Sequence, residues 1–75
     1  MGKITLKPTS NSKLKYEMKI DITPSWTIGD LLVNLNQYRS PSEQLRDILN
    51  HKMETLSNNY LLSKAANDFP FLYVN

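Results

Sequence analysis

A strict alternation of charged and apolar side chains over residues 13–22 constrains the fold of this chain more than any other feature. The odd positions carry charge, and the even positions are apolar: Leu14, Tyr16, Met18, Ile20 and Ile22. A period of two is typical of a half-buried β-strand, because successive side chains point to opposite faces of a sheet. The stretch therefore predicts a strand with one face in the core and one in solvent.

Residues 3–7 alternate in the same way, with Ile4 and Leu6 on one face and lysines on the other. Between the two stretches, residues 8–12 read Pro-Thr-Ser-Asn-Ser, which favours a turn. Together these segments predict a β-hairpin with an apolar inner face and a lysine-rich outer face. The basic charge of the chain is concentrated there, because residues 1–22 hold five of its nine basic residues and two of its seven acidic ones.

The chain has 75 residues and no cysteine. We therefore expect one domain over residues 1–75, without disulfide bonds or thiolate metal sites. A domain of this size buries only roughly 60% of the surface of its unfolded chain, so its stability should be modest. The first residues lack the apolar segment of a signal peptide, and no apolar run approaches the roughly 18 residues of a membrane helix. A cytoplasmic location, with entry into the nucleus open to so small a protein, and no membrane partner are expected.

A first helix is predicted over residues 28–38. Pro24 ends the second strand, because proline cannot donate a hydrogen bond to a strand ladder. Thr27 is a suitable N-cap, and Asp30 three residues later completes a variant of the capping box. Apolar residues then recur at helical spacing, at Ile28, Leu31, Leu32 and Leu35.

A second helix is predicted over residues 41–57. Ser40 is a suitable N-cap, followed by Pro41 at the first helical position and Glu43 at the third. Apolar residues follow at helical spacing, at Leu45, Ile48, Leu49, Met53 and Leu56. A strand over the same residues would put Asp47 on the face of Leu45 and Leu49, and burying an unpaired charge costs several kcal/mol.

Residues 71–74 are aromatic and β-prone, so they predict a short, buried final strand. The predicted fold class is therefore α+β, with two layers and the order ββααβ. In it the N-terminal hairpin and the C-terminal strand pack against two helices. The expected core residues are Ile4, Leu6, Tyr16, Met18, Ile20, Leu31, Leu32, Leu35, Leu45, Ile48, Leu49, Met53, Leu56 and Leu72.

Residues 3–32 resemble the opening of ubiquitin-like β-grasp domains: a hairpin, the loop Pro24-Ser25-Trp26-Thr27 and an amphipathic helix. Residues 55–74 are similar to the last turn and last strand of that family. Residues 41–57 depart from it, because the family continues with strands where this sequence favours a helix. The resemblance implies a binding module, and the absence of a terminal Gly-Gly implies that it is not conjugated to other proteins.

Little in the sequence points to catalysis. His51 is the only histidine, and its i, i+4 spacing from Asp47 on a helix fits half of a metal site or, more simply, a solvated ion pair. Gly2 and Gly29 are the only glycines, so neither nucleotide-binding fingerprint can be built. We predict a protein that is not an enzyme, with no catalytic, cofactor-binding or metal-binding residues and no cofactor.

The lysine-rich face of the hairpin is a candidate contact for nucleic acid or another anion. Its residues are Lys3, Lys7, Lys13, Lys15 and Lys19. The simpler interpretation is that lysines keep an exposed hairpin soluble. Sheets that bind single strands interleave aromatic rings with basic side chains. The only hairpin aromatic, Tyr16, is predicted on the core face, which argues against that mode of binding. The two predicted helices also match a helix-turn-helix, but the second has no net positive charge, so an ordinary helical hairpin is preferred.

Phe69, Phe71 and Tyr73 form the candidate protein interface. A strand that is apolar on both faces offers more apolar surface than one small core can cover, so a protein partner or a homodimer is expected to cover the rest. The favoured function is a small non-enzymatic protein-interaction module, either an adaptor or an inhibitor of a larger protein. The alternative is nucleic-acid binding through the lysine-rich hairpin face.

Overall fold

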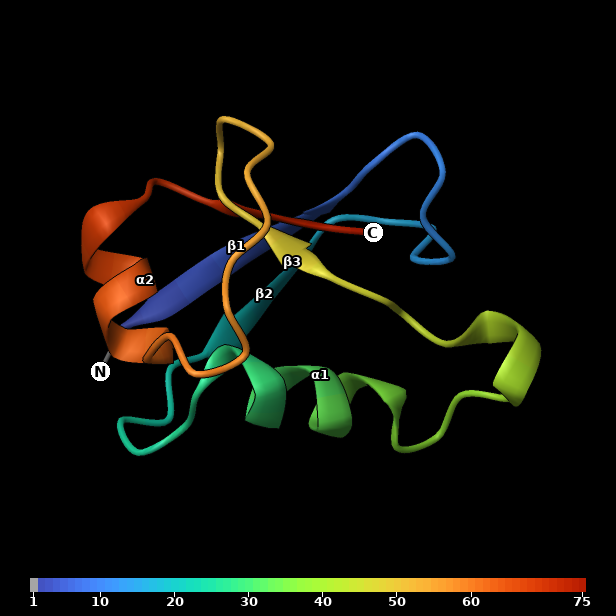
Figure 1. Ribbon diagram of the computed structural model, residues 1–75, viewed down its shortest axis with the longest axis horizontal. Helices are drawn as coiled ribbons and strands as arrows, with labels where there is room; N and C mark the ends of the chain where they lie inside the picture. Colours follow the sequence, from blue (N-terminus) through green and yellow to red (C-terminus); the bar gives the residue numbers. More distant parts are fainter. Residues whose placement is uncertain (1) are drawn as a thin grey trace.

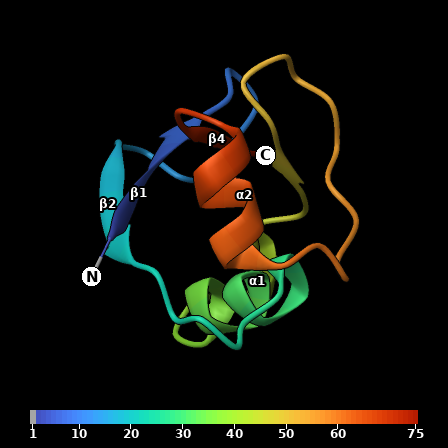
Figure 2. The same cartoon turned by 90° about the vertical axis from the view of Figure 1, so that its left-hand side faces the viewer.

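The computed structural model describes residues 2–75, which form an α+β domain around a four-stranded mixed sheet. In chain order the elements are β1 (Lys3–Pro8), β2 (Met18–Asp21), α1 (Ile28–Asn36), the 3-10 helix η1 (Pro41–Glu43), β3 (Ile48–Leu49), α2 (Leu62–Asp68) and β4 (Leu72–Val74). The strand order is β2-β1-β4-β3, and only the β1–β4 pair is parallel. Figures 1 and 2 both show α1 beneath the sheet. The predicted class, a hairpin and a C-terminal strand packed against two helices, is confirmed.

The predicted hairpin is present, but its second strand is shorter than residues 13–22. β1 and β2 pair antiparallel, with Leu6 opposite Met18. Continuing that register would place Tyr16 opposite Pro8, which has no N–H to donate, so the pairing stops. Tyr16, predicted in the core, is instead 64% exposed, whereas Leu14 in the preceding loop is buried.

Helix α1 begins at the predicted position and ends two residues early, at Asn36. A full capping box fixes its start: the Thr27 hydroxyl accepts from the Asp30 N–H at 3.3 Å, and the Asp30 carboxylate accepts from the Thr27 N–H at 3.0 Å. Gly29 donates its N–H to the Asn58 carbonyl at 2.9 Å. A Cβ at position 29 would lie 3.2 Å from that oxygen, so glycine lets the later loop approach the helix.

The predicted helix over residues 41–57 is wrong. Only its first turn forms, as η1, and Gln44 is already extended. The chain then runs beside the C-terminus, where Arg46 and Asp47 both donate to the Asn75 carbonyl oxygen, at 2.7 and 3.4 Å. Residues 48–49 continue as β3, an edge strand antiparallel to β4.

A β-bulge at Arg46 and Asp47 explains why apolar residues at helical spacing lie in an extended segment. The bulge arises because two consecutive residues face a single acceptor on the neighbouring segment. As a result Leu45 and Ile48, three positions apart, both face the core. Asp47 remains partly exposed, so no charge is buried. Met53 is not a core residue: it is 52% exposed and lies in a turn with a positive φ of 65°.

The second helix of the fold is α2, which lies beyond the segment predicted as the second helix. It buries Leu62 and Ala65. Backbone contacts join the N-terminus of α2 to that of α1: the Leu62 N–H donates to the Trp26 carbonyl at 2.9 Å, and Leu61 forms a β-bridge with Thr27.

The core lies between the sheet and the helices and is mostly aliphatic. Its buried hydrophobic residues are Ile4, Leu6, Leu14, Ile28, Leu31, Leu32, Leu45, Ile48, Leu56, Leu62, Ala65, Leu72 and Val74. Four predicted core residues are only partly buried: Met18, Ile20, Leu35 and Leu49. Within residues 2–75, no helix is long and apolar enough to cross a bilayer.

Candidate functional site

The outer face of the sheet, turned away from the core, carries the candidate interface. On β4, Leu72 and Val74 are completely buried, so Tyr73 between them points to the other side. Tyr73 is flanked in register by Lys7 of β1 and Leu49 of β3. All three side chains are partly exposed, so the outer face is an accessible surface.

Five rings form a continuous row from this outer face to α2. Adjacent ring centroids along it are 5.2 Å apart for Tyr73–Phe71, 6.2 Å for Phe71–His51, 5.8 Å for His51–Phe69 and 6.1 Å for Phe69–Tyr60. These distances suit edge-to-face and tilted aromatic contacts, each worth about 0.5–1.5 kcal/mol beyond area burial. We call these five residues the aromatic row. Each of its members is partly exposed.

A lysine stands over a ring near each end of the row. The Nζ of Lys7 lies 4.2 Å from the centroid of Phe71, and the Nζ of Lys64 lies 5.0 Å from that of Tyr60. Both distances fall within the roughly 6 Å range of cation–π attraction, worth about 0.5–1 kcal/mol at exposed sites. The surface is therefore aromatic in the middle and cationic at its borders.

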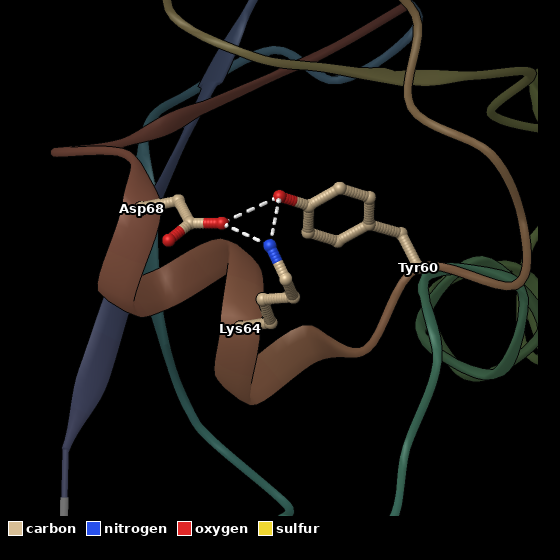
Figure 3. Close-up of polar contacts among 3 residues, drawn as sticks. All are labelled: Tyr60, Lys64 and Asp68. Carbon is tan, nitrogen blue, oxygen red and sulfur yellow. Dashed lines mark hydrogen bonds and ion pairs between the residues drawn. The ribbon is translucent and has the colours of Figure 1, made fainter.

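Tyr60, Lys64 and Asp68 form a polar network at the α2 end, drawn in Figure 3. The Tyr60 hydroxyl donates to Asp68 Oδ2 at 2.6 Å, and Lys64 Nζ donates to the same oxygen at 2.8 Å and to the Tyr60 hydroxyl at 3.3 Å. The hydrogen bond to Asp68, followed by that to Tyr60, raises the pKa of Lys64. The bond from Lys64, followed by that from Tyr60, lowers the pKa of Asp68. The network holds the Tyr60 ring in place.

His51 lies at the centre of the row rather than on a helix beside Asp47. Its ring contacts those of Phe69 and Phe71, and its Nδ1 atom is buried without a hydrogen-bond partner. The predicted i, i+4 relation with Asp47 does not exist, because residues 48–49 are a strand and residue 51 is in a turn. Within residues 2–75, no three His, Cys, Asp or Glu side chains cluster as a metal site would require.

The structure separates the five candidate lysines into two groups. Lys3, Lys7 and Lys19 lie on the outer face of β1 and β2, whereas Lys13 and Lys15 are exposed on the loop between the strands. Lys3 is paired with Asp21 at 2.9 Å across the hairpin. Three of the five lysines therefore share the outer face of the sheet, and of these Lys7 lies beside Phe71 and Tyr73.

The sequence identified Phe69, Phe71 and Tyr73 as the candidate interface, but not Leu49 or His51. Leu49 was assigned to a helix that does not form. The spacing of Tyr60, Lys64 and Asp68 in steps of four is a helical signal that could have located α2 and its polar network.

Two shallow depressions flank the exposed side of α1, on either side of Val33. One, of about 420 Å³, is lined by Leu32, Asn36 and Leu45 among others, and the other, of about 510 Å³, by Trp26 and Asn34 among others. Neither adjoins the aromatic row. Searches of protein-family models, curated proteins and solved structures found no match to this chain.

Proposed function

We propose that this protein is a small non-enzymatic protein-interaction module that binds its partner through the aromatic row, chiefly Phe69, Phe71 and Tyr73. The observation that carries the proposal is that Phe71 and Tyr73 are partly exposed on the face of the sheet opposite the core. Leu72 and Val74 fill the core side, so these two rings are not needed to close it, whereas Phe69 is partly exposed but also packs against the core.

The chemistry of the row supports this role. Tyrosine and other aromatic side chains are over-represented among the few residues that dominate binding energy in protein interfaces. Contacts along the row and with Lys7 hold these rings in place before binding, so little side-chain entropy is lost when a partner docks. An adaptor or an inhibitor of a larger protein would use such a surface without chemistry of its own.

The order of elements also supports a binding module. The hairpin, α1, the edge strand β3 and a final strand parallel to β1 resemble the arrangement of ubiquitin-like β-grasp domains. With β3 in place of the predicted helix, the main departure from that arrangement disappears. We infer that the resemblance extends over most of the chain rather than over residues 3–32 alone.

The test compares two tyrosines in capture and binding experiments. Tyr73→Ala removes a ring of the row, and Tyr38→Ala removes a ring that is 92% exposed beyond the end of α1. The wild type and Tyr38→Ala should retain the same partner from a lysate of the source cells. Titration with that purified partner should then give a dissociation constant for Tyr73→Ala at least about tenfold higher than for the other two proteins. Equal binding of all three proteins would contradict the proposal.

Nucleic-acid binding is a second candidate because of one observation. Lys3, Lys7 and Lys19 share the outer face with Phe71 and Tyr73, and single-strand binding sheets combine basic and aromatic side chains in this way. A labelled single-stranded oligonucleotide titrated at about 50 and 200 mM salt tests it. Binding that weakens with salt and with Tyr73→Ala would support this function, and absence of binding at the lower salt would exclude it.

A further inference from the structure

Strand β2 forms one edge of the sheet. Its only neighbour in the strand order is β1, and Figure 2 shows it at the rim, beside β1. Edge strands carry backbone groups that are free to pair with another chain. No proline interrupts residues 18–22, so this edge can accept a further strand.

The register identifies which backbone groups face outward. Ile22 donates its N–H to the carbonyl of Gly2 at 3.1 Å, and the two residues are opposite each other when the β1–β2 register is extended by one position. Hydrogen-bonded and non-hydrogen-bonded pairs alternate along an antiparallel ladder. Ile22 and Ile20 therefore direct their amides toward β1, and Lys19 and Asp21 direct theirs toward the free edge.

The side chains of this edge are complementary to themselves. Lys19 and Asp21 lie on the outer face, on either side of Ile20, which is partly buried on the inner face. A two-fold axis at Ile20 would put Lys19 of one copy opposite Asp21 of the other, and the reverse. Shifting the axis to residue 19 or 21 would instead oppose two lysines or two aspartates.

We propose that β2 pairs antiparallel with β2 of a second copy of this chain, centred on Ile20. Lys19 and Asp21 of each copy exchange backbone hydrogen bonds with Asp21 and Lys19 of the other, and their side chains form two cross-strand ion pairs. The two Ile20 side chains meet in a non-hydrogen-bonded pair, the closer type, at about 4.5 Å between Cα atoms. The result is one continuous eight-stranded sheet.

The inner face of the edge also gains from this pairing. Met18, Ile20 and Ile22 alternate along the edge and are only partly buried in the single chain. In the proposed register Met18 of each copy lies opposite Ile22 of the other, and the two Ile20 side chains face each other. The exposed apolar surface of these residues is therefore covered in the dimer. Asp21 already has Lys3 at 2.9 Å and gains a second lysine from the other copy. The contact is small, so the dimer is weak and exchanges rapidly.

Sedimentation equilibrium of the wild type at protein concentrations up to about 1 mM tests the proposal, together with two charge variants. Lys19→Asp should weaken association at least about fivefold by opposing aspartates, and Asp21→Lys should do the same by opposing lysines. An equimolar mixture of the two variants restores both ion pairs, so it should associate like the wild type. Lys52→Asp, at an exposed turn away from β2, is the charge control, and circular dichroism checks that each variant folds.

Lys19→Pro is an independent backbone variant. The Lys19 N–H faces the free edge, so proline there removes no bond to β1 but blocks two bonds across the dimer. A wild type that stays monomeric throughout the concentration range would overturn the proposal. So would a dimer that is unaffected by Lys19→Asp and Lys19→Pro, or a mixture of charge variants that associates no better than each alone.

Discussion

The two faces of strand β4 differ in burial and in residue type, although residues adjacent in the sequence form them. On the inner face Leu72 and Val74 are completely buried, whereas on the outer face Tyr73 and the adjacent Phe71 remain partly exposed. The inner residues are aliphatic and pack into the core, and the outer residues are aromatic and contact one another and Lys7. The segment is apolar on both sides, but only one side packs into the core, and the other stays partly exposed.

Leu72→Ala should produce the largest effect on stability. The side chain is fully buried and lies opposite Leu6 in the sheet, so truncation leaves a cavity and costs about 3 kcal/mol. Urea denaturation of both proteins measures this difference. A loss below about 1 kcal/mol, typical of surface substitutions, would contradict the assignment of Leu72 to the inner face.

Tyr73→Ala, one residue away, is the matched outer-face substitution. It removes a partly exposed ring and its edge-to-face contact with Phe71 at 5.2 Å, so a loss of about 1 kcal/mol is expected. The same denaturation experiment provides the value. Equal losses in the free energy of unfolding for Leu72→Ala and Tyr73→Ala would contradict the difference in burial between the two faces.

Met53→Gly should have a smaller effect of opposite sign. Met53 has a φ of 65°, which glycine adopts without steric cost, and its side chain is half exposed. We expect the free energy of unfolding to rise by about 0.5 kcal/mol. In a helix over residues 41–57 the same change would lower it by about 0.5–1 kcal/mol, so the sign tests the turn that follows β3.

The smallest effect is expected for Asp68→Asn, at the α2 end of the aromatic row. The pKa of Asp68 is lowered in the folded state, so its ion pair with Lys64 stabilises the protein above the ordinary pKa of 3.8 and is lost as the pH falls through the lower, folded value. The wild type should melt slightly above the variant at pH 7, and the two should converge in acid. The ion-pair part of the difference should also be lost at high pH, once Lys64, whose pKa is raised, loses its proton. A difference that persists unchanged in acid would exclude the ion pair as its cause.

The hairpin and α1 were predictable because their signals are local. Alternation in residues 3–7 and 18–21 needs only neighbouring side chains, and the capping box of Thr27 and Asp30 needs only one turn of backbone. Phe71 and Tyr73 were identified as interface candidates for a similar reason, because too many apolar residues were concentrated in one short segment.

Residues 41–57 were not predictable in the same way, because distant contacts decide their structure. The hydrogen bonds of Arg46 and Asp47 to Asn75 bring Leu45 and Ile48 to one face of an extended chain, which imitates the spacing of a helix. Asn50 then fixes the following turn by accepting from the N–H groups of Lys52 and Glu54. The outer positions of Leu49 and His51 depend on both contacts, so the sequence did not reveal them.

The proposed interface depends on the orientation of Tyr73, which faces away from the core between Lys7 of β1 and Leu49 of β3. Nuclear Overhauser contacts from the Tyr73 ring protons in the uniformly labelled protein test it most directly. We expect cross-peaks to the side chains of Lys7, Leu49 and Phe71 and none to those of Ile28 or Leu31 of α1. Cross-peaks from Tyr73 to α1 would contradict the account.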